Sequence, residues 1–346
     1  MEGTLSELVE QALEVRPLSR EQALFVLSYP EERVVELAGA VHRVRRRFFG
    51  NRVKLNALVN VKGGLCPEDC NYCSQSKVST AGIQKYPYLG TEEILLRAAK
   101  AREAGAKRLC LVASGRGPTS GEIERFTGTV GEVRRRYPEL EICACLGLLR
   151  DGQAEELKSA GVHAYNHNLN TSESFYGEIC STHTYEDRGR TVNKAKNSGL
   201  SACSGALFGM GETNDDIVDV AFALKAFEPD SVPINFLIPI EGTPLAGKAE
   251  LTPQRCLKIL ALFRLVFPAV EVRIAGGREV HLRSLQPLGL LLANSIFVGD
   301  YLTTEGQAAS KDLEMISDLG FVVESAGEKT LPRERVGSVV LKDYSG

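Results

Sequence analysis

Three of the nine cysteines in this chain stand close together, at Cys66, Cys70 and Cys73, with the spacing CxxxCxxC. Cysteine thiolates are the usual protein ligands of iron-sulfur clusters, and a 4Fe-4S cluster normally takes four of them. Three thiolates on one loop therefore leave one iron without a protein ligand. The spacing predicts a cluster with an open iron, at which a small molecule can bind and react.

Two other readings of these cysteines are weaker. A structural zinc site needs a fourth sulfur or nitrogen ligand, and the nearest candidates, His42 and Cys110, lie far along the chain. A disulfide framework is disfavoured because the cysteine count is odd, the chain is long, and residues 1–16 do not resemble a signal peptide. We therefore expect reduced thiols and a cytoplasmic protein.

The composition excludes several other classes of function. The chain has 346 residues, of which 43% are hydrophobic and 25% charged, and its net charge of -3 gives no reason to expect nucleic acid as a partner. No run reaches the roughly 18 to 20 apolar residues that cross a bilayer, so we expect no membrane partner. A short basic run is expected to be a solvated helix face; it contains Arg43, Arg45, Arg46 and Arg47.

The elements that must position the cysteines follow from the pattern of apolar residues. From about residue 56, eight short runs rich in Val, Ile and Leu alternate with helical patterns, as in a parallel sheet with crossover helices. The runs lie near 57–62, 107–113, 140–147, 162–169, 201–208, 232–239, 270–275 and 294–298. Eight strand-helix units predict an α/β fold, a (β/α)8 TIM-type barrel with its active site at the carboxyl ends of the strands. The cysteine loop follows the first run, at that face.

Helix-start signals support this alternation. Thr119 with Glu122 and Thr213 with Asp216 have capping-box spacing, and Thr252 precedes a proline that suits a first helical position.

The chain divides into three predicted parts. Ser19 with Gln22 caps a short helix before the barrel, and Pro30 opens a longer helix that runs through the arginines. We predict a helical extension, the barrel and a short C-terminal tail packed on its outside, at residues 1–55, 56–322 and 323–346.

Polar residues recur inside the predicted barrel. Asn166, Asn168 and Asn170 are two apart in the fourth strand, so they share one face. If that face is the lumen, unpaired amides would cost about 1 to 3 kcal/mol each and would need a polar ligand. The alternative is a solvent-facing surface, which suits a helix-covered strand poorly. Asn235 in the sixth strand raises the same question.

Further cysteines fall on the second, third and fifth strands. Cys110, Cys143 and Cys203 are each an ordinary buried residue when taken singly, but together they can converge, and Cys145 shares a face with Cys143. Arg273 on the seventh strand adds a cation that must be paired. Either a second, anionic cluster or a plain carboxylate would pair it. The remaining cysteines, Cys180 and Cys256, are expected to be inert.

Together these motifs resemble those of a known family. The cysteine triad is followed by YNHNL at 165–169, GMGE at 209–212, SVPIN at 231–235, AGGRE at 275–279 and ANSIF at 293–297. The triad alone resembles the radical S-adenosylmethionine superfamily, and the later motifs, over roughly residues 50–320, resemble the biotin synthase family.

The resemblance implies an activity and its cofactors. Cys66, Cys70 and Cys73 would hold a 4Fe-4S cluster that binds S-adenosyl-L-methionine, and a 5'-deoxyadenosyl radical would take hydrogen from dethiobiotin. A 2Fe-2S cluster would supply the sulfur for biotin, held by Cys110, Cys143, Cys203 and Arg273. The resemblance thus selects Cys143 over Cys145.

The resemblance also assigns the remaining site residues. Dethiobiotin would be contacted by Asn166, Asn168, Asn235, Thr303 and Thr304. The S-adenosylmethionine site would be lined by Ala113, Asn168, Asn170, Arg188 and Leu207. Some family members have Asp where this chain has Asn170, which puts nucleoside affinity in question.

Partners follow from the family as well. It implies an electron donor such as flavodoxin or ferredoxin, the iron-sulfur assembly machinery and a homodimer. Two competing functions share part of the pattern: a radical maturase that helps to assemble a hydrogenase cofactor, and a carrier that only delivers clusters. The second cysteine set with Arg273 argues against the first, and the lumen asparagines with Arg188 argue against the second.

Overall fold

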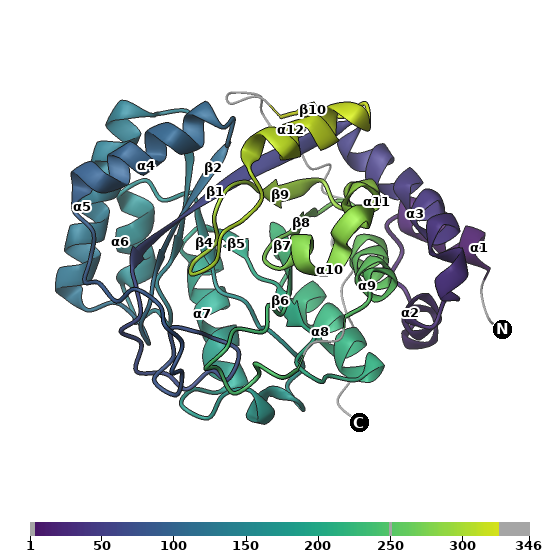
Figure 1. Cartoon of the computed structure of the whole chain (residues 1–346), viewed down its shortest axis with the longest axis horizontal. Coiled ribbons are helices and arrows are strands. Elements are labelled where there is room, and N and C mark those ends of the chain that lie inside the picture. Colours follow the sequence, from purple (N-terminus) through teal and green to yellow (C-terminus); the bar gives the residue numbers. More distant parts are fainter. Residues whose placement is uncertain (1–3, 249–250, 325–346) are drawn as a thin grey trace.

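The computed structural model describes residues 4–248 and 251–324, which form a closed parallel barrel surrounded by helices (Figure 1). Neighbouring strands pair in chain order, and β1 (Arg52–Lys62) pairs with β9 (Ser295–Phe297), which closes the barrel. Each of these pairings is parallel, as helical crossover connections require. The predicted (β/α)8 TIM-type barrel is confirmed.

Each of the eight predicted runs overlaps a strand. The remaining barrel strands are β2 (Arg108–Ala113), β3 (Glu141–Cys145), β4 (Ala164–Asn166), β5 (Ser201–Cys203), β6 (Ala206–Phe208), β7 (Ser231–Phe236) and β8 (Glu271–Ile274). The run at 201–208 is interrupted, so β5 and β6 together fill the fifth position. At the interruption, a Cβ on Gly205 would lie 1.9 Å from the carbonyl oxygen of Pro233, so only glycine permits this close approach.

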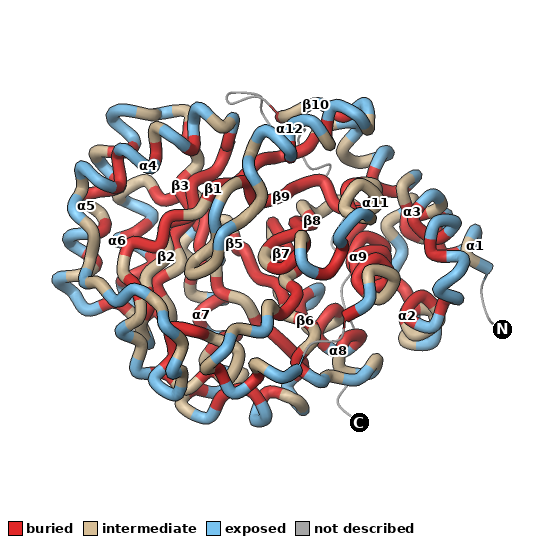
Figure 2. Tube along the Cα trace, in the orientation of Figure 1, coloured by how far each residue is buried: buried red, intermediate tan, exposed pale blue. Residues whose placement is uncertain are grey.

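Helices cover the outside of the barrel. They are α4 (Thr91–Glu103), α5 (Ser120–Arg136), α6 (Gln153–Ser159), α7 (Tyr185–Asn197), α8 (Asn214–Ala226), α9 (Pro253–Val266), α10 (Arg278–Leu282), α11 (Gln286–Leu292) and α12 (Ala309–Asp318). The barrel strands are largely buried, whereas the outer helices carry exposed faces (Figure 2). The predicted caps are confirmed, because the hydroxyls of Thr119, Thr213 and Thr252 accept first-turn backbone N–H groups.

The N-terminal extension consists of helices that pack on one side of the barrel (Figure 1). They are α1 (Leu5–Leu13), α2 (Arg20–Leu27), a 3-10 turn (Glu31–Arg33) and α3 (Val34–Phe49). Ser19 and Gln22 form the predicted capping box. The helix expected after Pro30 begins with the 3-10 turn and continues as α3, which contacts α9 and α11. The extension therefore shares its core with the barrel.

The chain boundaries differ in detail from those predicted. The strand β1 begins at Arg52, inside the range assigned to the extension, and a further short strand, β10 (Val322–Val323), pairs in parallel with its first residues. The predicted outer packing of the tail concerns mainly residues that lie outside the described part of the chain. Within the described ranges, no helix combines the length and apolar character needed to cross a bilayer.

The prediction that the basic run is a solvated face is wrong for Arg45. This residue has no exposed surface, and its guanidinium donates to the carbonyl oxygens of Gly50 and Arg52 and lies 4.3 Å from the ring centroid of Phe321. It satisfies backbone acceptors where α3 ends and β1 begins. A run of like charges did not reveal that one of its members points inward, toward these carbonyls.

Candidate active site

The cysteine loop leaves the barrel at the carboxyl end of β1 and is held by its own backbone. Cys73 N–H donates to the carbonyl oxygen of Cys70 at 3.1 Å, and Lys77 N–H donates to that of Glu68 at 2.8 Å. Cys70 is buried, whereas Cys66 and Cys73 are partly exposed. Burial raises the pKa of Cys73 to about 11, and nearby Cys66 adds to the shift. The three thiols thus stand on one loop at the barrel mouth, within electrostatic range of one another, and the donor set suits an iron-sulfur cluster.

Arg188 is a residue of α7, and its buried side chain places a positive charge beside these thiols. Its guanidinium donates to the backbone oxygen of Asn168 at 2.8 Å and to the hydroxyls of Tyr176 and Tyr72 at 2.5 and 3.4 Å. Burial opposes its charge, yet the two phenol oxygens keep the pKa of Arg188 above its ordinary value. The site therefore holds a fixed positive charge that these three hydrogen bonds orient, with Cys70 as a near neighbour.

The asparagines predicted to share a face do so only in part. The strand β4 ends at Asn166, whose Nδ2 donates to Oδ1 of Asn168 at 3.2 Å. Asn170 lies beyond the strand, with a left-handed φ of 73°, and its Nδ2 donates to the Tyr72 hydroxyl at 2.6 Å. Asparagine tolerates this conformation better than most residues. Strand alternation therefore fails at Asn170, which turns toward the cysteine loop.

A second set of thiols converges within the barrel wall. Cys110 and Cys143 are direct partners in β2 and β3, and the backbone of Cys203 on β5 pairs with that of Asn166 on β4. Hydrogen bonds with Cys110 and Cys203 raise the pKa of Cys143 and lower those of its two partners. Nη1 of Arg273 lies 3.7 Å from Sγ of Cys203. All four side chains are buried, so they meet without access to solvent.

Cys145 is set apart from this group. Burial raises its pKa to about 12, and its interactions with Cys110 and Cys203 are electrostatic, without the hydrogen bonds that Cys143 makes. The geometry therefore favours Cys143 as the third sulfur.

Arg273 has the carboxylate partner that the sequence left open, as well as the sulfur neighbour. Its Nη2 lies 2.5 Å from Glu271, and the same carboxylate reaches Lys54 at 3.6 Å and Arg108 at 3.9 Å. Glu141 also pairs with Lys54 and Arg108, at 2.6 and 2.9 Å. Three cations thus face two carboxylates beneath the thiols. Arg273 and Arg108 lower the pKa values of Cys110 and Cys203 further, so the site favours anionic sulfur.

The side-chain amide of Asn235 is hydrogen-bonded within the protein, although we expected it to need a polar ligand. Its Nδ2 donates to the carbonyl oxygen of Ala206 at 3.2 Å, and its Oδ1 accepts from Gly276 N–H at 3.0 Å. Asn166 is closer to the second thiol set, because its Nδ2 lies 3.2 Å from Sγ of Cys203. The lumen amides are thus partly satisfied by the protein itself, which holds them in fixed orientations.

The remaining residues expected at the site lie around the barrel mouth. Thr303 and Thr304 follow β9, and the Thr303 hydroxyl is 2.8 Å from that of Ser74, next to Cys73. Leu207 on β6 packs in one apolar cluster with Cys70, Tyr72 and Cys73. These contacts bring the segment after β9 and the cysteine loop together.

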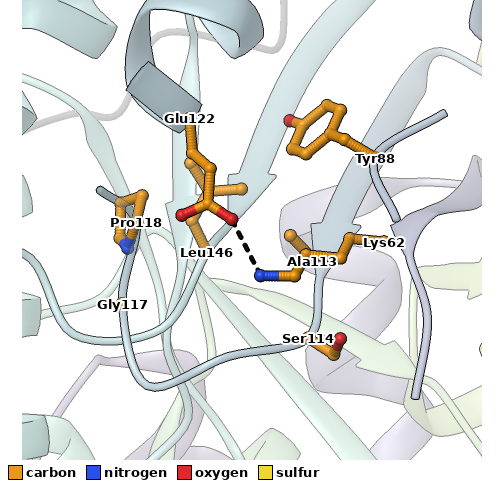
Figure 3. A pocket seen from close by; sticks show the side chains of 8 residues that line it. All are labelled: Lys62, Tyr88, Ala113, Ser114, Gly117, Pro118, Glu122 and Leu146. Atoms are coloured by element: carbon orange, nitrogen blue, oxygen red, sulfur yellow. Dashed lines mark hydrogen bonds and ion pairs between the residues drawn. The ribbon is translucent and has the colours of Figure 1, made fainter. Parts of the chain in front are cut away.

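Ala113 faces a small pocket at the ends of β1 and β2, in which Lys62 Nζ donates to Glu122 Oε1 at 2.8 Å (Figure 3). The other lining residues are Tyr88, Ser114, Gly117, Pro118 and Leu146. This pocket borders the site and does not contain the thiols.

Sequence reasoning missed a group of side chains behind the cysteine loop. Sγ of Cys180, expected to be inert, lies 3.7 Å from Sγ of Cys70 and 3.2 Å from Nδ1 of His183. His183 Nδ1 in turn lies 2.6 Å from Glu68 Oε2. The hydrogen bond with Cys70 lowers the pKa of Cys180 below its ordinary value. The Cys-x-x-His spacing at 180–183 was the available signal.

Comparisons with known proteins agree with this geometry. Residues 60–224 match the model of the radical SAM superfamily, and residues 233–322 match that of the biotin and thiamin synthesis associated domain. A biotin synthase of Streptomyces coelicolor is 59% identical over 96% of this chain and 81% of that protein. A biotin synthase of Bacillus cytotoxicus is 52% identical over 91% of this chain and 94% of that protein.

Solved structures support the fold. A crystal structure of methylornithine synthase superposes with a TM-score of 0.81 at 22% identity, covering 92% of this chain and 98% of that one. An FeFe-hydrogenase maturase from Carboxydothermus hydrogenoformans gives a TM-score of 0.76 at 20% identity, over 93% and 79% of the two chains. With the identity to the curated relatives, and with both thiol sets assembled in one barrel, the chain belongs to the biotin synthase family of radical S-adenosylmethionine enzymes.

Proposed function

We propose that this enzyme inserts sulfur into dethiobiotin to make biotin, using S-adenosyl-L-methionine and two iron-sulfur clusters. Membership of the radical S-adenosylmethionine superfamily implies a 4Fe-4S cluster and that nucleoside. The observation that carries the proposal further is the presence of two separate thiol sets in one barrel, one at the mouth and one in the wall.

The residues present fit both groups. Cys66, Cys70 and Cys73 would hold the 4Fe-4S cluster, and the second thiol set would hold the 2Fe-2S cluster; that set consists of Cys110, Cys143, Cys203 and Arg273. When bound, these groups supply an electron that cleaves S-adenosylmethionine to a 5'-deoxyadenosyl radical, and the sulfur that enters the product. The surplus of buried cations under the second set supports an anionic occupant there.

The remaining residues bind and orient the organic molecules. Arg188 offers its buried charge to the carboxylate of S-adenosylmethionine, and Asn170 offers its amide to the ribose. That site would be completed by Asn168, Ala113 and Leu207. Dethiobiotin would contact Asn166, Asn168, Asn235, Thr303 and Thr304. Because Asn166 lies beside Cys203, a substrate bound to it is held near the second thiol set.

Catalysis also needs partners. We propose a flavodoxin or ferredoxin as electron donor, the iron-sulfur assembly machinery as the source of clusters, and a homodimer, by analogy with the family.

One assay tests the proposed reaction. Anaerobically reconstituted protein, given dethiobiotin, S-adenosylmethionine and a reductant, is expected to yield biotin and 5'-deoxyadenosine, detected by mass spectrometry. Deoxyadenosine without a sulfur-containing product would favour a maturase-like activity, and the absence of both products would favour a cluster carrier. Either result contradicts the proposal.

The residue at position 170 tests the nucleoside site. Asn170→Asp is expected to bind S-adenosylmethionine about tenfold more tightly, because a hydrogen bond from a ribose hydroxyl to a carboxylate is stronger than one to an amide. Aspartate also tolerates the left-handed backbone, and the Tyr72 hydroxyl, which accepts from Asn170 Nδ2, can instead donate to the carboxylate, so the melting temperature should change little. Equilibrium dialysis measures the affinity. An unchanged affinity would show that this side chain does not contact the nucleoside.

A further inference from the structure

Cys180 is a buried thiol with no part in the proposed reaction, yet it touches an expected cluster ligand. Its Sγ lies 3.7 Å from Sγ of Cys70, and both side chains are almost wholly buried. A disulfide has an S–S length of about 2.05 Å, so the two sulfurs must approach each other by roughly 1.7 Å to form the bond.

The backbone holds the two cysteines side by side. Asn71 N–H donates to the carbonyl oxygen of Ile179 at 2.9 Å, and Asn71 Nδ2 donates to that of Glu178 at 2.9 Å. On the other side, Ser181 N–H donates to Oδ1 of Asp69 at 3.0 Å. The residues on either side of Cys70 are thus hydrogen-bonded to residues on either side of Cys180. These hydrogen bonds between the two loops, and not only the side-chain rotamers, keep the two thiols close to each other.

We propose that Cys70 and Cys180 form a reversible disulfide in the cluster-free protein, which makes Cys180 a redox switch for cluster loading. The oxidant is a small dialkyl disulfide. One thiol attacks it and releases the first small thiol, and the second protein thiol then displaces the other. The protein loses two protons and two electrons, and the oxidant is reduced to two thiols.

The consequence concerns cluster uptake. While the disulfide is present, Cys70 cannot bind iron, so the loop retains two of its three ligands. A thiol reductant restores all three. This consequence rests on the proposed role of Cys70 as a ligand, whereas the bond itself is detected without any cluster.

Peptide mapping locates the bond. Cluster-free protein is treated anaerobically with hydroxyethyl disulfide, alkylated and digested without reduction. Trypsin releases residues 63–77, with Cys66, Cys70 and Cys73, and residues 159–188, with Cys180 as their single cysteine. We expect these two peptides to be joined. Further cleavage after Glu68 and Tyr72 isolates Cys70 from its neighbours, so mass spectrometry identifies the partner of Cys180.

Cluster uptake provides an independent readout. Oxidation should slow reconstitution of the wild-type protein at least about tenfold, and dithiothreitol should reverse the effect. Cys180→Ala, or Cys180→Ser if alanine impairs folding, should keep its rate within about twofold after oxidation. Cys256→Ala is the matched control, because Cys256 is also buried but lies on α9, and it should behave like the wild type.

Three results would overturn the proposal. One is recovery of Cys180 as an alkylated free thiol after oxidation, and another is a bond from Cys180 to Cys66 or Cys73. The third is protection of Cys180 by added zinc with no disulfide formed under oxidant, which would make Cys70, Cys180 and His183 a metal site instead. A disulfide found in protein that makes no biotin would leave this inference standing while the proposed function fails.

Discussion

Cys143→Ala is expected to lose the second cluster and keep the first, whereas Cys145→Ala keeps both. The Cys143 thiol is hydrogen-bonded to those of Cys110 and Cys203. Removing its sulfur therefore leaves only two cysteine ligands for the second cluster. Cys145 lies on the same strand without those bonds, and its loss removes only a partly exposed thiol. The two variants thus form a matched pair: each removes one thiol from β3, but only Cys143 is hydrogen-bonded to Cys110 and Cys203.

Iron and sulfide analysis of the anaerobic proteins checks this prediction. Cys143→Ala should lack the iron and sulfide of one 2Fe-2S cluster and its visible absorption, and biotin formation should fall below detection. Cys145→Ala should match the wild type in metal content. The reverse pattern would overturn the assignment of the third sulfur.

Arg188→Met is expected to bind S-adenosylmethionine at least about 100-fold more weakly while keeping its 4Fe-4S cluster. Removing one partner of a buried charged pair costs roughly 3 kcal/mol, which corresponds to about two orders of magnitude in affinity. Arg188 is buried beside the loop, but it is not a cluster ligand in the proposed scheme. Binding is measured by equilibrium dialysis on reconstituted protein.

Two further variants make this result interpretable. Arg190→Met removes an exposed arginine from the same helix and should leave affinity unchanged. Arg188→Lys keeps the charge but loses the forked geometry, so its affinity should be intermediate. Normal affinity in Arg188→Met would remove Arg188 from the nucleoside site.

The barrel was predictable because its signal is local and repeated. Each strand-helix unit carries its own apolar run and often its own cap, as at Thr119 and Thr213. The break between β5 and β6 was not predictable, because it arises from the approach of Gly205 to Pro233, a residue on another strand. The inward turn of Arg45 depends likewise on carbonyl groups that only the folded chain brings near.

The two halves of the site differ in the same way. Cys66, Cys70 and Cys73 are neighbours in sequence, so their spacing alone predicted a cluster. Cys180 lies 110 positions beyond Cys70, and its contact depends on the hydrogen bonds that join the two loops. The Cys-x-x-His spacing at 180–183 marks Cys180 and His183 as a pair, but it does not report the contact with Cys70.

The second thiol set was only half visible in the sequence. Alternation put Cys143 and Cys145 on one face and left the choice open, and only the resemblance selected Cys143. The partners of Arg273 were open too. The folded chain gives it the carboxylate of Glu271 as a partner and also places it 3.7 Å from Sγ of Cys203.

The central claim is that the second thiol set holds the sulfur that enters the product. A single anaerobic turnover without added sulfide tests it most directly, with biotin, 5'-deoxyadenosine and the absorption of the 2Fe-2S cluster followed together. The account predicts that biotin rises as that absorption falls, and that Cys143→Ala makes deoxyadenosine but no biotin. Biotin formed by Cys143→Ala, or by the wild type with the 2Fe-2S absorption intact, would contradict it.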